Sequence, residues 1–386
     1  MMQRLICLAI LAMALLVALP AAADDATGPN LRRGVNLSNW LANAQRQPLF
    51  DHDFQQIKTV GFDHVRLPID PEFLGFSATE AGSGRILFDF APIDEALGLA
   101  MANGLSVILV IHPSDGFLSL VEQDARAEEG FVKLWQHIAD HYKLYPSNVL
   151  AFEILNEPEY DEDTGRYSEL MGDVVAALRR IVPRHLIIID SPQGSDINSL
   201  NSFYPIKDSN VAYAFHFFEP DIFTRQGMNL GPEWRMIRYF RGLPYPSALV
   251  NPSTNYAPKA PDSAKAKKEL MDYASAAWNE AHIRARIQLA GDWARANHAR
   301  ILCTEFGARR AFINASQRYQ WIGDTRRALE ADGIVWDLWD YTDLFGIVKL
   351  KGDTVTEPVD GSVRFVEPDK GVREIEPDAI KALFSK

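Results

Sequence analysis

Two glutamates in this sequence end short apolar runs. Glu157 follows the run 149–156 and is itself followed by Pro158, and Glu305 lies near the end of the run 300–306. Two carboxyl groups that face each other across a cleft suit the cleavage of a glycosidic bond. One group must be protonated to release the leaving oxygen, and the other must be ionised to attack the anomeric carbon.

Other apolar runs also end in polar or aromatic side chains. These residues are Arg66, His112, Asn156, His216 and Trp339. One such residue could be a chance cap, but several at the ends of buried strands indicate a polar pocket above a packed core. Either glutamate alone could form a structural salt bridge there, for instance with Arg66, whereas the two together favour catalysis.

Eight apolar, β-branched runs must position these side chains. They are residues 33–37, 64–68, 105–112, 149–156, 185–190, 211–218, 300–306 and 334–340. Helical patterns separate them, among them the apolar residues spaced by three and four in 131–142 and the long segment 264–298. This alternation predicts an α/β fold, a closed (β/α)8 TIM barrel, in which the strand ends meet at one face. A doubly wound sheet is the alternative, but no glycine-rich phosphate turn follows the first run.

No repeat or linker divides the chain, so residues 24–386 are predicted to form a single domain. The irregular segment 219–261, after the sixth run, carries seven prolines and six aromatic residues. A loop of this length usually forms a functional wall or lid. The alternative is a surface excursion that packs its own aromatic side chains.

Taken together, these motifs resemble glycoside hydrolase family 5, the cellulase-like family of clan A. The similarity rests on residues 33–37, 65–68, 155–158, 214–218, 304–307 and Trp339, and it extends over residues 32–348. The resemblance implies a retaining β-glycanase with Glu157 as acid/base and Glu305 as nucleophile. It implies neither a metal nor another cofactor.

The resemblance also implies roles for the neighbouring residues. Asn156 would hold the 2-hydroxyl of the sugar. Arg66 and His216 would orient and polarise the two glutamates. His112 would line the glycone subsite, and Trp339 would be a platform for a sugar ring.

One position departs from the family pattern. The family usually has His-x-Tyr on the sixth strand, where the tyrosine hydroxyl donates to the nucleophile, but this chain has Phe218 two residues after His216. Strand alternation places Phe218 on the same face as His216, so the missing hydroxyl belongs to the pocket. Either activity is reduced, or another donor such as Tyr341 takes its place.

The substrate expected from the resemblance is a β-linked glucan, and a β-1,4-glucan such as cellulose is the first candidate. Mannan, xyloglucan, β-1,3-glucan and a bacterial exopolysaccharide stay open, because the loops that set specificity carry no readable motif. A non-catalytic glycan-binding barrel is the alternative of a different class, and only Phe218 favours it. Oligomeric state leaves no signal in the sequence.

Composition excludes several other classes. The 386 residues are 47% hydrophobic and 23% charged, and the formal charge is −12 with no basic run. A nucleic-acid partner would need clustered cations to neutralise phosphates. The nine histidines show no His-Glu-x-x-His spacing, which argues against a zinc hydrolase. No Gly-x-Ser-x-Gly elbow is present, which argues against a serine esterase.

The first 23 residues are typical of a signal peptide. Arg4 precedes an apolar run of 15 residues, 5–19, and Ala21 and Ala23 suit signal peptidase. The run is shorter than the ~20 residues of a membrane-spanning helix, although a retained anchor is the alternative. The mature protein is expected in the periplasm or outside the cell, without stable membrane insertion. It would keep only Cys303, a buried thiol, and no intrachain disulfide.

Overall fold

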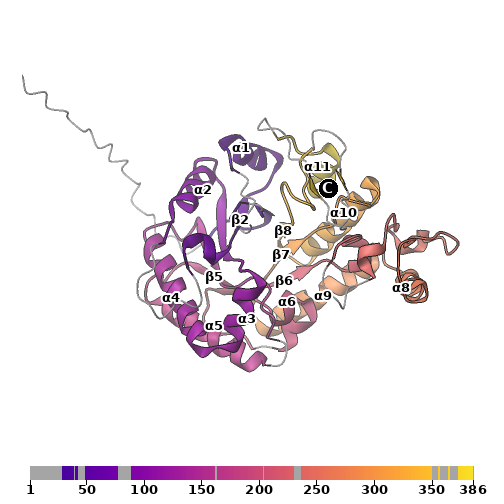
Figure 1. The fold of residues 1–386 in the computed structure, drawn as a ribbon. Helices are drawn as coiled ribbons and strands as arrows, with labels where there is room; N and C mark the ends of the chain where they lie inside the picture. The colour runs from indigo at the N-terminus through magenta and orange to yellow at the C-terminus, as the bar shows by residue number, and fades with distance from the viewer. Residues whose placement is uncertain are drawn as a thin grey trace, which may run out of the picture.

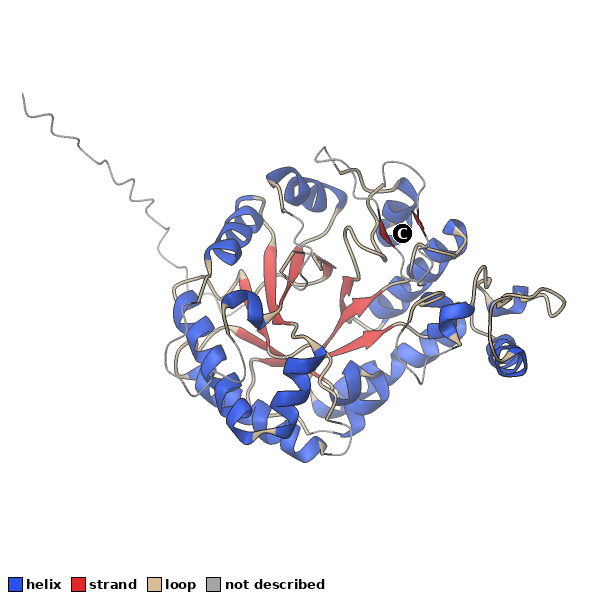
Figure 2. Ribbon diagram, in the orientation of Figure 1, coloured by secondary structure: helices blue, strands red, loops and turns tan. Residues whose placement is uncertain are grey.

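The computed structural model describes residues 28–38, 40–41, 48–76, 88–160, 163–202, 204–229, 236–349, 355–356, 364–365 and 373–385. Eight parallel strands close a barrel in sequential order, and helices surround it (Figures 1 and 2). The predicted (β/α)8 fold is therefore confirmed. The predicted signal peptide, residues 1–23, lies outside the described residues.

The barrel strands coincide with the eight predicted runs to within a few residues. They are β1 (Arg33–Asn36), β2 (His64–Ile69), β3 (Ser106–Ile111), β4 (Leu150–Glu153), β5 (Leu186–Asp190), β6 (Val211–Phe217), β7 (Arg300–Phe306) and β8 (Val335–Leu338). A separate antiparallel pair joins β9 (Val355–Thr356) and β10 (Arg364–Phe365).

Strand alternation separates two apolar clusters. On β3, Val107, Leu109 and Ile111 belong to the main core between barrel and helices. Ile108 belongs to a smaller cluster with residues of β4 to β7, such as Ala151. Because successive side chains point to opposite faces, this smaller cluster fills the barrel interior, and the next inward positions carry the polar groups of the site.

The helices cover the outer face of the barrel. They are α1 (Asp51–Val60), α2 (Ala91–Ala102), α3 (Asp115–Gln123), α4 (Ala125–Tyr142), α5 (Thr164–Arg179), α6 (Pro192–Ser195), α7 (Asp221–Thr224), α8 (Ser263–Ser275), α9 (Glu280–Asn297), α10 (Ala315–Ala331) and α11 (Pro377–Phe384). The 3₁₀ turns are η1 (Pro71–Leu74), η3 (Ile197–Ser202), η4 (Ile237–Tyr239) and η5 (Ser247–Leu249).

Helix α4 shows why these segments are helical. The Asp124 side chain caps its first turn by accepting the Arg126 N–H. Phe131, Trp135 and Ile138 recur on one face and are fully buried against the barrel. That spacing is the amphipathic pattern by which the helix was predicted.

The predicted helical segment 264–298 is two helices, α8 and α9, and not one. Ala277 adopts φ 56°, which no helix tolerates, and the Asn279 side chain begins α9 by accepting the His282 N–H. The prediction rested on the periodicity of the apolar residues, which does not reveal the N-cap at Asn279 and therefore did not divide the segment into two helices.

The predicted irregular insertion after β6 has no strand and only short helical turns among its described residues, namely α7, η4 and η5. Together with α8 it projects from the side of the barrel (Figure 1). Residues 230–235, which include Trp234, lie outside the described part of the chain.

A buried ion-pair cluster lies at the N-terminal ends of the strands, which we call the floor of the barrel. The His64 imidazole lies 2.6 Å from Asp63 through Nδ1 and 2.9 Å from Asp337 through Nε2. A Cβ atom at Gly34 would lie 2.1 Å from Asp337 Oδ1 and 2.3 Å from His64 Nε2, so only glycine fits there.

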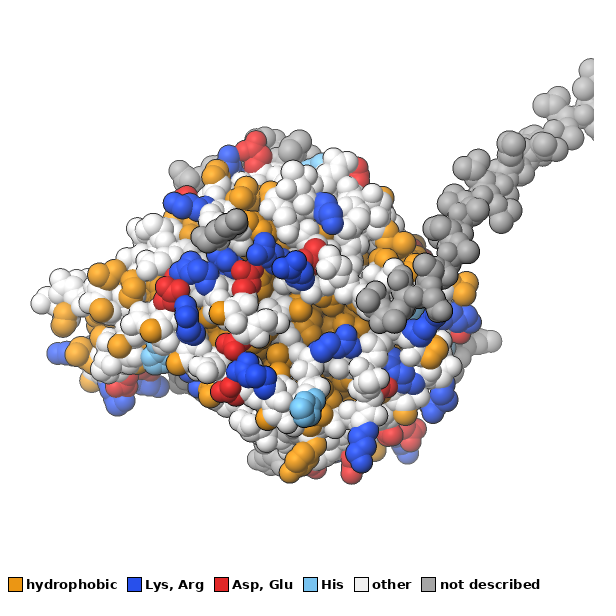
Figure 3. Space-filling model, turned by 180° about the vertical axis from the view of Figure 1, so that it is seen from behind, with side chains coloured by type: hydrophobic (Ala, Val, Ile, Leu, Met, Phe, Trp, Pro, Cys, Tyr) orange, Lys and Arg blue, Asp and Glu red, His pale blue; other side chains and the backbone are white. Residues whose placement is uncertain are grey.

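Seen from behind, the surface intersperses Lys and Arg with acidic and apolar side chains (Figure 3). Within the described ranges, no helix has the length and apolar character needed to cross a membrane. Cys303 is a free, fully buried cysteine, as predicted.

Candidate active site

The C-terminal ends of the strands, which we call the mouth, bring the predicted site residues together. Arg66, His216 and Glu305 lie within strands β2, β6 and β7, whereas His112 and Trp339 directly follow β3 and β8. Asn156 and Glu157 come three and four residues after the end of β4, later than a strand reaching residue 156 would place them. Hydrogen bonds and ion pairs join five of the seven predicted residues, namely Arg66, Asn156, Glu157, His216 and Glu305, and the rings of His112 and Trp339 stack on each other.

Arg66 is the central cation of the site and is fully buried. Its Nη1 donates to Glu305 Oε1 at 2.7 Å and to Asn36 at 2.8 Å. Its Nη2 donates to Asn156 Oδ1 at 2.7 Å. Glu153 accepts from Nε and Nη2 at 2.9 and 2.8 Å, so one guanidinium holds two carboxylates in fixed geometry.

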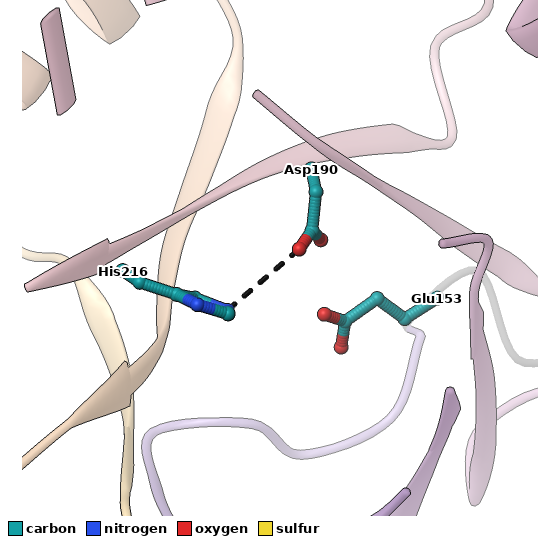
Figure 4. A group of neighbouring side chains, drawn as sticks. All are labelled: Glu153, Asp190 and His216. Atoms are coloured by element: carbon teal, nitrogen blue, oxygen red, sulfur yellow. Dashed lines mark ion pairs between the residues drawn. The ribbon is translucent and has the colours of Figure 1, made fainter. Parts of the chain in front are cut away.

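His216 lies between the two predicted catalytic glutamates. Its Nδ1 is 2.9 Å from Glu157 Oε1 and 3.7 Å from Glu305 Oε2. Its Nε2 is 3.7 Å from Asp190 Oδ2, the ion pair drawn in Figure 4. Burial lowers the pKa of His216, but the charges of Glu305 and Glu157 outweigh burial and raise the pKa to about 9.

The two glutamates differ in the direction of their pKa shifts and in their exposure. Partial burial raises the pKa of Glu157, but the hydrogen bond and charge of His216 lower it to about 2. Burial raises the pKa of Glu305 despite the opposing charges of His216 and Arg66. The side chain of Glu157 is 40% exposed, whereas that of Glu305 is 5% exposed.

Glu305 points into the mouth because β7 is irregular. The register with β6 shifts after Phe215, so that Glu305 pairs with His216. Cys303 and Phe306 both join the outer core, an odd spacing that strict alternation would not allow. An extra residue of this kind re-aims the neighbouring side chain, here the carboxylate.

Glu157 has an unusual backbone conformation. Its φ is +44°, in the left-handed region, which costs about 1–3 kcal/mol for a residue other than glycine. Its N–H donates to Asp190 Oδ2 at 3.4 Å. The next carbonyl, of Pro158, accepts the Gly194 N–H at 2.8 Å, so the loop after β5 supports this turn.

His112 and Trp339 form one wall of the mouth. Their rings stack with centroids 5.9 Å apart and planes inclined by 16°, and both side chains are partly exposed. Burial, with the charge of Arg66, lowers the pKa of His112 to about 4, so this imidazole is neutral at pH 7.

Phe218 lies beside His216, with ring centroids 6.5 Å apart, and the Arg225 guanidinium lies 4.4 Å above its ring. The suggestion that Tyr341 replaces the missing hydroxyl is wrong. The fully buried Tyr341 side chain points toward α1, where its hydroxyl donates to Asp53 at 3.0 Å. Within the described residues, Arg66 donates to the Glu305 carboxylate at 2.7 Å, closer than the His216 Nδ1 at 3.7 Å.

Four residues of the mouth were not predicted: Asn36, Glu153, Asp190 and Arg225. Asn36 and Asp190 are the last residues of β1 and β5, so the rule that selected the other strand ends would have found both. Glu153 was visible as a charge inside an apolar run. Arg225 had no signal, because it lies in the irregular insertion.

Two groups of side chains bring potential metal ligands together. Glu153, Asp190 and His216 form one, and Glu157, His216 and Glu305 form the other, with ligand atoms within 4.8 Å of one another. A metal-binding histidine must be neutral. The carboxylates around His216 favour its protonated form instead, and Arg66 already pairs with Glu153 and Glu305. The donor sets therefore fit a hydrogen-bonded network better than a metal site.

The curated proteins that this chain resembles include endoglucanases and a cellodextrinase. Endoglucanase 3 of Fibrobacter succinogenes is 26% identical over 83% of this chain and 50% of its own length. Cellodextrinase A of Ruminococcus flavefaciens is 29% identical over 52% of this chain and 62% of its own length. Endoglucanase C of Acetivibrio thermocellus is 25% identical over 81% of this chain and 91% of its own length. This chain thus spans about half to two thirds of the first two relatives.

Solved structures share the fold. Cel5A of Thermotoga maritima, in complex with cellobiose, superposes with a TM-score of 0.69 at 24% identity, covering 92% of this chain and 97% of that one. The cellulose synthase subunit Z of Clostridioides difficile superposes with a TM-score of 0.68 at 24% identity, covering 92% and 100%. The family model for cellulase, glycosyl hydrolase family 5, matches residues 24–344. The chain belongs to glycosyl hydrolase family 5, a family of O-glycoside hydrolases.

Proposed function

We propose that this protein is a retaining β-glycanase that hydrolyses β-1,4-glucan, with Glu157 as acid/base and Glu305 as nucleophile. The spacing of the two carboxylates carries this proposal, because their nearest oxygens lie within 4.8 Å. Carboxyl groups ~5–5.5 Å apart are typical of retaining enzymes, whereas inverting enzymes separate them by ~6.5–9.5 Å to admit a water.

In the first step, Glu305 attacks the anomeric carbon while the bond to the leaving oxygen breaks. Glu157 donates a proton to that oxygen, and a glycosyl ester of Glu305 forms. Arg66 holds Glu305 through Oε1, which aims the carboxylate and favours its ionised form.

The proton for this step is stored on the pair of Glu157 and His216. In the free enzyme the imidazole holds it, 2.9 Å from Glu157 Oε1. A bound sugar would cover the exposed part of the Glu157 side chain and remove water from it. Desolvation raises a carboxyl pKa, so the proton would move to Glu157 as the substrate binds.

In the second step, Glu157 removes a proton from water, which attacks the ester and releases the sugar with its original configuration. Asn156, whose Oδ1 is bound to Arg66, presents its amide NH₂ to the 2-hydroxyl. The stacked rings of His112 and Trp339 offer a flat surface to the glycone.

The relatives support a β-1,4-glucan first, since their names are endoglucanase and cellodextrinase. Mannan stays open, because a Thermotoga maritima Cel5A structure contains mannotriose. Xyloglucan, β-1,3-glucan and exopolysaccharide remain the further alternatives.

The test is a reducing-sugar assay of residues 24–386 on soluble β-1,4-glucan, β-1,3-glucan, xyloglucan and mannan. We expect release from β-1,4-glucan, and proton NMR should detect the β-anomer first. An α-anomer first would refute the role of Glu305. Binding without release from any glycan would favour the non-catalytic barrel.

We further propose that residues 1–23 are removed on export, so that the enzyme acts in the periplasm or outside the cell. The positive, apolar and small-residue regions of this segment support the proposal. N-terminal sequencing of the protein secreted by a bacterial host should give Asp24 as the first residue. A retained Met1 in the membrane fraction would instead indicate an anchor.

A further inference from the structure

A buried carboxyl group lies directly behind His216 and has no part in the mechanism above. Asp190 is the last residue of β5 and is fully buried. Ile187 and Ile189 face the outer core, so Asp190 points into the barrel. Figure 4 shows its carboxyl group between His216 and Glu153.

Asp190 contacts both parts of the acid/base unit. Its Oδ2 is 3.7 Å from the Nε2 of His216, on the ring edge opposite Glu157. The same oxygen accepts the backbone N–H of Glu157 at 3.4 Å. It thus touches the imidazole that binds the Glu157 carboxylate and also the strained peptide that aims this side chain.

Other groups hold Asp190 in place. The Ser195 hydroxyl donates to Oδ2 at 2.7 Å, and the Tyr167 hydroxyl donates to the Asp190 backbone carbonyl at 2.7 Å. Ser195 lies in a turn where Gln193, Gly194 and Ser195 all have positive φ. Two strained segments, one after β4 and one after β5, therefore meet at Asp190 and hold each other.

Burial and neighbouring charges act in opposite directions on the pKa of the Asp190 carboxyl group. Burial and then the charge of Glu153 raise its pKa well above the usual range, although His216 and Arg66 oppose them. The Oδ2 atom accepts from the Ser195 hydroxyl and from the Glu157 N–H, and a proton on the carboxyl group would let it donate to the neighbouring Glu153 as well. An asparagine side chain offers the same pattern, an NH₂ donor and a carbonyl acceptor.

We propose that Asp190 is a positioning residue for the acid/base, holding the His216 ring and the Glu157 peptide so that the proton donor faces the leaving oxygen. This inference rests on the proposed glycanase function. Asp190 itself does not touch the sugar. Its loss should therefore impair the steps that Glu157 assists and leave the attack by Glu305 intact.

The test compares two substrates that differ in their need for an acid. Cleavage of cellotetraose expels a sugar alkoxide, a poor leaving group that needs a proton, whereas cleavage of 2,4-dinitrophenyl β-cellobioside expels 2,4-dinitrophenolate, which leaves without protonation. For Asp190→Ala we expect kcat/KM on cellotetraose to fall about 10- to 100-fold, part of the ~10²- to 10⁴-fold of general acid catalysis. On the dinitrophenyl substrate, kcat/KM should stay within about threefold of the wild type.

A second signature comes from the same measurements. Deglycosylation still needs Glu157 as base, so kcat and KM on the dinitrophenyl substrate should fall together as the glycosyl-enzyme accumulates. A residue that merely stabilises the fold would not produce this split. Asp190→Asn should keep kcat/KM within about threefold on both substrates because it preserves the hydrogen-bonding pattern.

The matched control is Asp337→Ala, which removes a buried aspartate from a buried histidine at the floor of the same barrel. This variant should change kcat/KM by the same factor on both substrates. If Asp190→Ala does not fold, Asp190→Ser replaces it, since its shorter side chain cannot reach both partners, and the same split is expected.

Equal losses on the two substrates, or no loss on either, would overturn the inference while leaving the proposed function intact. An Asp190→Asn variant as impaired as Asp190→Ala would overturn the hydrogen-bonding role assigned to Asp190. A wild-type protein that cleaves neither substrate would refute the proposed function, and the inference with it.

Discussion

The barrel contains two buried histidines, each between carboxylates, one at its floor and one at its mouth. His64 is held on both nitrogens, by Asp63 at 2.6 Å and Asp337 at 2.9 Å. His216 is held closely on one nitrogen, by Glu157 at 2.9 Å, and its other nitrogen is 3.7 Å from the nearest carboxylate, Asp190. In both cases neighbouring carboxylates overcome burial and raise the pKa to about 9.

The difference lies in access and not in charge. At the floor, the side chains of Asp63 and Asp337 are 14% and 0% exposed and that of His64 is fully buried, so the cluster offers little surface to a ligand. At the mouth, the Glu157 side chain is 40% exposed, so a ligand can alter the partner of the imidazole. A perturbed pKa therefore marks a functional group only where a substrate can reach one of the partners.

The largest expected effect is at the mouth. Glu157→Gln should lower kcat/KM on a natural glucan by about 10²- to 10⁴-fold, because a proton donor is lost. Glu305→Gln should lower it further, because no covalent intermediate can form. Kinetics on soluble β-1,4-glucan test this, with circular dichroism and glycan binding expected to be retained. A near-wild-type rate in either variant would show that the substituted glutamate is not catalytic, and the functional difference between mouth and floor would then be unsupported.

At the floor we expect the reverse of the effect at the mouth: a substitution should lower the stability of the fold and leave the turnover rate of the folded protein unchanged. His64→Ala leaves Asp63 and Asp337 without their shared cation, and breaking a buried pair typically costs about 3–5 kcal/mol. Urea unfolding would measure this cost, and kcat per folded molecule should match the wild type. A variant that is stable but inactive would show that the floor takes part in the reaction.

The same variant has a predicted pH dependence. The pKa of His64 rises from 6.5 in the unfolded chain to about 9 in the folded one, so folding favours its protonated form. The stability gained from this pair is fully present below pH 6.5 and is lost as the pH rises through about 9. The gap in unfolding free energy between wild type and His64→Ala should narrow accordingly; a constant gap would contradict the ion pair.

A smaller effect is expected from restoring the missing hydroxyl at the mouth. Phe218→Tyr should favour ionised Glu305 and so lower its pKa, which burial holds above the usual value. Because Glu305 must be ionised to attack, the acidic limb of kcat/KM should move to lower pH by about half to one unit.

The alkaline limb, set by the acid/base, should hardly move. Phe345→Tyr is the control, since its ring packs against Phe218 at 5.7 Å and the same hydroxyl is added one ring further along. Superimposed acidic limbs for wild type and Phe218→Tyr would mean that Phe218 is a packing substitution only.

The smallest effect concerns Cys303, on the outer side of β7 between floor and mouth. If residues 1–23 are removed as proposed, Cys7 is lost and the chain has no second cysteine; the Cys303 thiol is free and fully buried. A reductant should therefore leave the melting temperature of the monomer unchanged. A marked drop would place the cleavage site before Cys7 or reveal a linkage between chains.

Particular residues show how far sequence reasoning reached. Runs such as 106–111 are continuous and apolar because parallel strands are buried on both faces, so all eight strands were predictable. The irregularity of β7 was not, because no residue type marks where a strand gains an extra residue. Tyr341 was misassigned because it follows Trp339 and Asp340 closely in sequence, yet its side chain turns outward to Asp53.

Gly34 shows that the motif at residues 33–37, which contributes to the family resemblance, reports on the closure of the barrel and not on catalysis. A side chain there would collide with the His64 and Asp337 pair, at the end of the barrel opposite the reaction. A chain that had lost both Glu157 and Glu305, the proposed catalytic residues, would need this glycine just as much to close its barrel. Among uncharacterised genes, the motif at residues 33–37 therefore identifies the architecture, and a genome survey that counts enzymes should count the two glutamates instead.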